Sequence, residues 1–205
     1  MSALRRLCRA ALSVALALLL LLGCGLRVTP PASLQEPCLV AIIDYGVHAG
    51  LLLPRDAGRS VEYAYGNWEY FALNRTDRWT ALRTVLPARG TLGRTEIALG
   101  LADAAERAAA EPDRAAIYLK VERSAAMELL GELDRRFERN IARAHENTEI
   151  GMSFVPDERA YWAADNCNGE LARWLRRLSC RVEGLALVAQ IEIAAATTAA
   201  GCTAP

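Results

Sequence analysis

The sequence predicts an α+β domain, and three observations lead to this prediction. The chain has 205 residues, 53% of them hydrophobic, which is enough to bury the core of one domain. Short apolar or alternating stretches, typical of strands, are mixed with longer stretches of helical spacing. No internal repeat divides the chain. The 24 basic and 24 acidic residues balance, so no overall charge favours nucleic acid as a partner.

The first 23 residues have the pattern of a secretory signal. Three arginines precede an apolar run over 10–22, which is short for a membrane span of about 20 apolar residues. The run ends in Leu-Leu-Gly-Cys, which resembles the bacterial lipobox and implies that Cys24 is lipidated. We therefore expect a membrane-anchored lipoprotein of the bacterial cell envelope that faces the periplasm. An ordinary signal peptide or an N-terminal anchor helix is the alternative.

The rest of the chain divides into three parts. Residues 24–37 contain three prolines and predict a tether, residues 38–195 predict the domain, and residues 196–205 predict a tail of small residues. An extracytoplasmic compartment permits disulfides, and the four cysteines after Cys24 allow three complete pairings. A bridge between Cys180 and Cys202 would clip the C-terminal end.

The first half of the domain predicts mainly strands. The apolar run 39–43 predicts a buried strand, and a second apolar run over 47–53 predicts another. Residues 60–65 alternate as a third strand after a turn rich in Asp and Gly. Apolar residues over 79–86 have helical spacing.

The second half predicts helices separated by short strands. Three helices are expected, over 95–110, 124–145 and 168–178. Two strands are expected, over 116–121 and 185–193. The stretch 147–159 is polar and is expected to be irregular.

His48 is the more informative of the two histidines. It lies in the apolar stretch 47–53, whereas His145 lies among polar residues and is expected to be solvated. A buried imidazole needs a partner for each ring nitrogen, because an unpaired polar group in a core costs about 1–3 kcal/mol. His48 is therefore either a structural histidine bonded to backbone or a functional base.

Cys167 is the second candidate. It lies in the sequence Asp-Asn-Cys-Asn-Gly-Glu at the start of a predicted helix, where free amides and the helix dipole favour a thiolate. Its neighbours Asn166 and Asn168 are candidates for capping the helix or forming an oxyanion site. A lone Cys with a distant His is a candidate nucleophile and base. The alternative is that Cys167 forms half of a structural disulfide.

Glu62 is the candidate for orienting the imidazole. If residues 47–53 and 60–65 form a hairpin about residue 55, Glu62 lies opposite His48. Cross-strand partners have Cβ atoms about 4.5–5.5 Å apart, within reach of a carboxylate. Glu62 would then fix the ring tautomer and stabilise the imidazolium. A solvated acid on the strand face is the alternative.

Three segments carry a resemblance to a known family. They are Val-His-Ala-Gly-Leu at 47–51, Val-Glu-Tyr-Ala-Tyr-Gly-Asn-Trp-Glu-Tyr-Phe at 61–71, and Asn-Cys-Asn at 166–168. In this order they resemble the uncharacterised bacterial family DUF2459. Val47 and Ala49 depart from the Trp and Thr of that family. The resemblance therefore supports an expected arrangement of catalytic residues better than it supports any particular substrate.

The same order is similar to the circularly permuted papain-like thiol hydrolases and acyltransferases of NlpC/P60 type. This resemblance implies a permuted papain-like α+β domain with an antiparallel sheet packed against helices. It also implies Cys167 as nucleophile, His48 as base and Glu62 as the orienting residue.

These features predict an envelope-anchored cysteine hydrolase or acyltransferase acting on an amide or ester of a cell-wall peptide, lipid or acyl group. The alternative is a non-catalytic envelope lipoprotein that uses the same fold for binding or assembly. No cofactor is expected, because zinc-ligand spacing and a phosphate-binding glycine loop are missing from the sequence. Four arginines near the last helix form either a solvated face or a contact for anionic lipid or peptidoglycan: Arg173, Arg176, Arg177 and Arg181.

Overall fold

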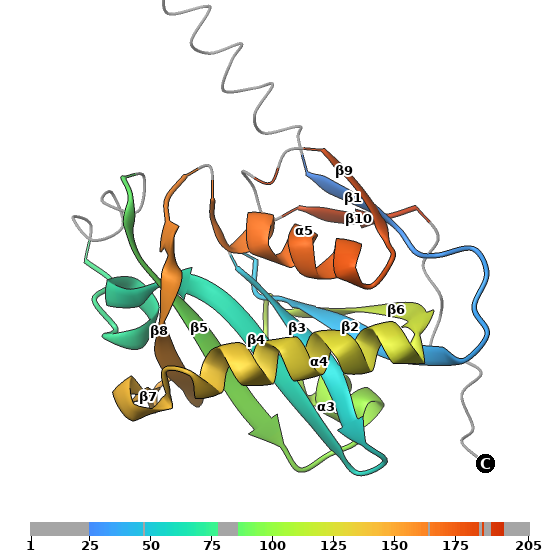
Figure 1. Ribbon diagram of the computed structural model, residues 1–205, viewed down its shortest axis with the longest axis horizontal. Coiled ribbons are helices and arrows are strands. Elements are labelled where there is room, and N and C mark those ends of the chain that lie inside the picture. Colours follow the sequence, from blue (N-terminus) through green and yellow to red (C-terminus); the bar gives the residue numbers. More distant parts are fainter. Residues whose placement is uncertain are drawn as a thin grey trace, which may run out of the picture.

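The protein is built around an antiparallel sheet with helices on both faces (Figure 1). The structure, a computed structural model, describes residues 25–46, 48–77, 86–163, 165–184, 186 and 190–194. The predicted signal, Cys24 and the predicted tail lie outside these residues, as does nearly all of the predicted helix over 79–86. The α+β class and the packing of helices on an antiparallel sheet are confirmed.

Seven strands form the main sheet in the order β6-β2-β3-β4-β5-β8-β7. In that order they span Ala115–Glu122, Pro37–Asp44, Ala49–Asp56, Arg59–Asn67, Ala88–Ile97, Met152–Tyr161 and His145–Asn147. All pairs of neighbouring strands are antiparallel. The strands β2, β3 and β4 pair in chain order, as short connections between antiparallel strands favour.

Side chains of the central strands alternate between the two faces of this sheet. On β3, Ala49, Leu51 and Leu53 join one buried cluster, whereas Leu52 joins another on the opposite face. Successive side chains of a strand point to opposite sides, so this division follows directly from strand geometry. We call the side of Leu51 the α5 face and the side of Leu52 the α3 face.

Two helices cover the α5 face. They are α4, Arg123–Glu138, and α5, Cys167–Arg177, and both lie in front of the strands in Figure 1. Their apolar side chains complete the larger buried cluster: Leu129, Leu130, Leu133 and Phe137 from α4, and Leu171, Trp174 and Leu175 from α5. Spacings of three and four residues place each set on one side of its helix.

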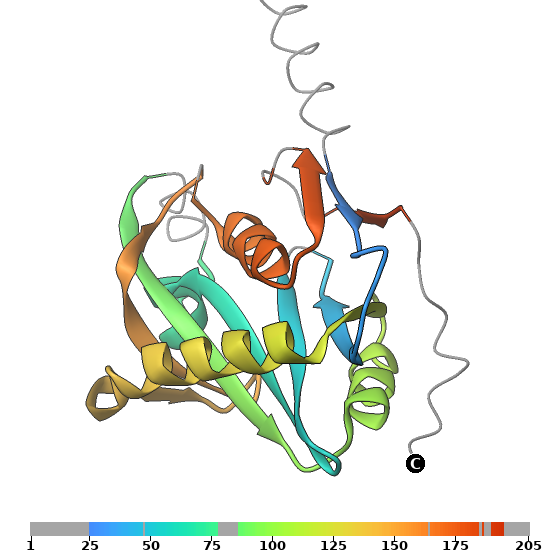
Figure 2. The ribbon, with the colours of Figure 1, turned by 45° about the vertical axis from the view of Figure 1, so that its right-hand side comes forward.

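The α3 face is also covered. The helix α3, Leu101–Ala109, packs against the Leu52 cluster, and Figure 2 shows it on the opposite side of the sheet from α4 and α5. A π-helical turn, η1 over Trp68–Ala72, packs Phe71 and Ala72 against the same face of β4. Burial on both sides explains why parts of β2 and β3 are continuous apolar runs.

A second, three-stranded sheet contains the N-terminal end of the described chain. Its central strand β1, Leu26–Thr29, pairs with β9, Arg181–Gly184, and with β10, Ile191–Ile193. Leu26 and Val28 are 1% and 0% exposed and join the α5-face cluster. The prediction of a tether over 24–37 is therefore wrong for β1. The alternation of buried Leu26 and Val28 with exposed Arg27 is a strand pattern that the following prolines obscure.

The sequence does not predict the strands β5 and β8. The helix expected over 95–110 is found only as α3, because residues 95–97 complete β5. The polar stretch 147–159, expected to be irregular, lies largely in β8. Its acidic Asp157 is accommodated there by an ion pair with Arg136 of α4 at 2.7 Å, a contact that local sequence does not reveal.

Two other boundaries differ from the prediction. The helix expected over 124–145 ends at Glu138, and a single 3-10 turn, η2 over Ile141–Arg143, follows it. Asn140 stands between them in a non-helical conformation, so the helix does not continue. Of the strand expected over 185–193, residues 191–193 form β10, whereas 185 and 187–189 lie outside the described residues.

The role of β1 is testable by substitution. Leu26→Ala should lower the free energy of unfolding by about 2–5 kcal/mol, because it removes a fully buried side chain. The matched control Arg27→Ala, at an exposed position of the same strand, should change it by less than about 0.5 kcal/mol. Urea denaturation of the full chain in a neutral detergent measures both. Equal, negligible effects would mean that residues 26–29 are a tether.

Candidate functional site

Cys167 is the first residue of α5, and its side chain is buried. Asn166 caps the helix, because its Oδ1 accepts a hydrogen bond from the Gly169 N–H at 3.0 Å. The Cys167 Sγ lies 4.0 Å from Tyr161 Oη and 3.9 Å from Asn168 Oδ1. The Asn168 side chain therefore presents an acceptor oxygen to the thiol, whereas the oxyanion site suggested by the sequence requires a donor.

The surroundings of Cys167 favour a neutral thiol. Burial raises the pKa of the Cys167 thiol, and this effect outweighs the hydrogen bonds from Tyr161 and from the backbone amides of the helix start. A helix N-terminus alone lowers a thiol pKa, so desolvation is the stronger influence here. Cys167 and Cys180 are free thiols, and Cys202, the suggested partner of Cys180, lies outside the described residues.

A buried ion network holds the first turn of α5. Glu170 is 2% exposed and accepts hydrogen bonds from Arg136, from Arg173 at 2.7 Å and from Trp174 Nε1 at 3.1 Å. A buried carboxylate is tolerated when several donors surround it. This network positions the backbone of α5, and with it the start of the helix at Cys167.

The arginines near the last helix have partners within the protein. Arg173 pairs with Asp165 and Glu170, Arg177 with Glu132, and Arg181 with Glu183. Arg176 donates to the Val182 carbonyl at 3.1 Å. These contacts favour a structural and solvated role over a free basic patch.

His48 lies directly before β3 and is 8% exposed. Its ring centroid is 4.7 Å from that of Phe71 in η1 and 6.1 Å from that of Tyr45. Its Nδ1 has no hydrogen-bond partner among the described residues. Burial lowers the pKa of His48 to about 4, so the imidazole is neutral at physiological pH.

Glu62 is 5% exposed and bonds to Tyr45. The Tyr45 hydroxyl donates to Glu62 Oε1 at 2.7 Å. The carboxyl group lies over Gly50, where the Cβ of any other residue would overlap it. Burial raises the pKa of Glu62 to about 7, although the bond from Tyr45 and the charge of Arg114 act in the opposite direction.

The observed strand register corrects the expected pairing of His48 with Glu62. The hairpin of β3 and β4 forms, but Glu62 lies opposite Leu52 because the turn is centred after residue 55. Asp56 holds this turn by accepting hydrogen bonds from the Gly58 N–H at 3.0 Å and from Arg59 Nε at 2.7 Å. Glu62 therefore contacts Tyr45 and makes no hydrogen bond to His48.

The thiol and the imidazole lie on opposite faces of the sheet. His48 contacts Phe71, which packs on the α3 face, and Glu62 also lies on that face, over Gly50. Cys167 contacts Tyr161, which packs with the α5-face cluster. No hydrogen bond between the described residues links Cys167 to either His48 or Glu62.

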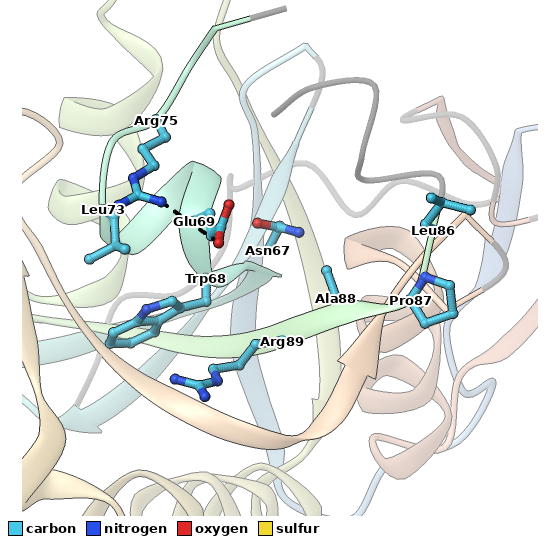
Figure 3. Close-up of a pocket in the computed structure, with 9 residues that line it drawn as sticks. All are labelled: Asn67, Trp68, Glu69, Leu73, Arg75, Leu86, Pro87, Ala88 and Arg89. Atoms are coloured by element: carbon cyan, nitrogen blue, oxygen red, sulfur yellow. Dashed lines mark ion pairs between the residues drawn. The ribbon is translucent and has the colours of Figure 1, made fainter. Parts of the chain in front are cut away.

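An open pocket lies between η1 and the start of β5 (Figure 3). Its volume is about 600 Å³, and it is lined by Asn67, Trp68, Glu69, Leu73, Arg75, Leu86, Pro87, Ala88 and Arg89. Figure 3 shows the η1 residues on one side and Ala88 and Arg89 on β5, with Leu86 and Pro87 far from Trp68. The sequence did not single out this pocket, because its residues converge only through the pairing of β4 with β5.

Two further observations limit the chemistry of the described residues. No three His, Cys, Asp or Glu side chains within the described ranges are grouped to hold a metal ion. No helix in the described part of the chain has the length and apolar character needed to cross a membrane.

Comparisons with known proteins add no relative. No family model, curated protein or solved structure matches this chain. The resemblance to DUF2459 and to permuted papain-like enzymes therefore stays a prediction from the motifs.

The two buried titratable groups should give opposite pH dependences of stability. The pKa of His48 falls from 6.5 to about 4 on folding, so its contribution is present above pH 6.5 and is lost as the pH falls toward 4. The pKa of Glu62 rises from 4.5 to about 7, so its contribution is present below pH 4.5 and is lost as the pH rises toward 7. Each effect is about 3 kcal/mol.

Single substitutions should separate these two effects. In Glu62→Gln only the His48 effect remains, so the free energy of unfolding of this variant should increase more steeply than that of the wild type as the pH rises from 4 to 6.5. His48→Gln should make the free energy of unfolding fall between pH 4.5 and 7. Urea denaturation across this range measures both slopes. If both variants keep the wild-type slope, the two groups are not buried as described.

Proposed function

We propose that this protein is a lipoprotein of the bacterial envelope, anchored through Cys24, that binds a ligand rather than hydrolysing one. The lipobox-like sequence supports the anchor and the periplasmic location. The separation of Cys167 from His48 and Glu62 supports a binding role.

The observation that supports this proposal most strongly is that the sheet lies between the Cys167 thiol and the His48 imidazole. A general base must lie within about 2.6–3.2 Å of the proton it accepts, or reach it through one water. In structures without substrate the distance between base and nucleophile is often longer than this. A base on the other face of the sheet is, however, not merely too distant, because the strands lie between it and the nucleophile. Burial also favours the neutral thiol of Cys167, whereas the nucleophile in cysteine catalysis is the thiolate.

We further propose that the fold is a variant of the permuted papain-like arrangement. His48 before one strand, Glu62 on the next and Cys167 at a helix start support this, because they follow the order of the motif resemblance. In this proposal the architecture is retained and the catalytic site is not assembled.

Cysteine hydrolysis or acyl transfer is the second candidate function. The position of Cys167 at the first residue of α5 favours it, because the free amides of a helix start stabilise negative charge. It requires β3 to present His48 to the α5 face.

Thiol reactivity distinguishes these two functions. If Cys167 is a neutral buried thiol, it should not react rapidly with iodoacetamide at pH 7. The rate at which the full chain is labelled in a neutral detergent should therefore be the same for the wild type and for Cys167→Ala. The matched control is Cys180→Ala, which removes another buried thiol, whose pKa burial raises to about 11. Rapid labelling that is lost in Cys167→Ala and in His48→Ala, but kept in Cys180→Ala, would contradict the binding proposal.

A further inference from the structure

The pocket beside η1 combines cationic and apolar side chains. Among the described residues that line it, the cations are Arg75 and Arg89, and the one acid is Glu69. Arg75 pairs with Glu69 at 3.7 Å, while no carboxylate among the described residues pairs with Arg89. The described lining therefore carries a net positive charge and one arginine whose donors are available to an anion.

Apolar side chains form the rest of the pocket lining that concerns ligand binding. The Trp68 ring and Leu73 line one side of it, and Leu86 lies on the far side. Leu86 is 64% exposed, the most exposed large apolar side chain in the described part of the chain. A ligand with an anionic group next to an apolar group would match both parts of this lining.

The pocket lies at the end of the molecule from which the proposed anchor leaves. Gly90 pairs with Asn67 and Ala88 with Tyr161, so the pocket stands at one end of the sheet. Figures 1 and 2 both show the start of β5 and the end of β8 at the same end as the start of β1. Since Cys24 directly precedes the described chain, this end faces the bilayer if Cys24 is lipidated.

An exposed tryptophan adjoins the pocket at this end. Trp162 follows β8 and is 41% exposed. Tryptophan is the side chain that favours the interface between lipid and water. Ala88 pairs with Tyr161, so the exposed Leu86 and Trp162, which flank this pair along the chain, both lie at this end of the sheet.

We propose that this pocket binds an anionic phospholipid of the membrane to which the protein is anchored. Arg89, with Arg75, would bind the phosphate, and Trp68, Leu73 and Leu86 would contact the apolar part. This inference rests on the proposed binding function, for which it names the ligand class.

The test uses the full lipidated chain in a neutral detergent, with dihexanoylphosphatidylglycerol as probe and tryptophan fluorescence as readout. Saturable binding is expected, and Arg89→Gln should weaken it about five-fold, from about 1 kcal/mol per arginine near an anionic lipid. The matched control is Arg107→Gln, an exposed arginine of α3, which should leave it unchanged. Dihexanoylphosphatidylcholine should bind more weakly than the anionic probe.

Three outcomes would overturn the inference. They are absence of saturable binding, equal weakening by Arg107→Gln, and binding of inorganic phosphate as tight as that of the lipid. The anchor is tested separately by metabolic labelling of cells with a tagged fatty acid, which should label the wild-type protein and not Cys24→Ala. If the wild-type protein takes up no fatty acid, the proposed lipoprotein fails, whatever the lipid-binding result.

Discussion

The division of β3 and β4 side chains between two buried faces decides where the candidate residues of these strands lie. Leu51 and Tyr63 pack under α4 and α5, whereas Leu52 and Glu62 face the opposite side. A shift of the strand pairing by one residue would move every side chain to the other face of the sheet. The register is therefore strongly specified where both faces are buried. The same alternation places His48 beside Phe71 and away from Cys167. Two residues that the sequence motif suggests as a catalytic pair therefore lie in two separate buried environments.

The sequence predicted those parts of the fold whose signal is local. The apolar runs of β2 and β3 and the helical spacing of α5 are such signals, and their positions are confirmed within a few residues. The strand β8 was not predictable, because Asp157 is stabilised by Arg136 of a distant helix. The expected cross-strand pairing of His48 with Glu62 was wrong for a similar reason, since it depended on a turn that Asp56 places later than expected.

The buried polar networks of the described structure differ from its open pocket. Glu170 and its arginines hold α5, and Glu62 with Tyr45 fills the space over Gly50, so both networks serve the core. The pocket beside η1 is different, because its lining is open to solvent and includes a cation without a described acidic partner. Its place at the same end of the molecule as the start of β1 is consistent with the proposed contact with a membrane.

The central claim, that Cys167 and His48 do not form a catalytic pair, can be measured by NMR titration. The full chain, labelled with ¹³C at cysteine Cβ and at the histidine ring, would be titrated and assigned with Cys167→Ser. We predict that Cys167 ionises at a higher pH than an exposed thiol, because burial raises its pKa, and that His48 titrates near pH 4, independently of it. Ionisation of Cys167 below pH 7, coupled to a His48 that stays charged above pH 7, would contradict the account.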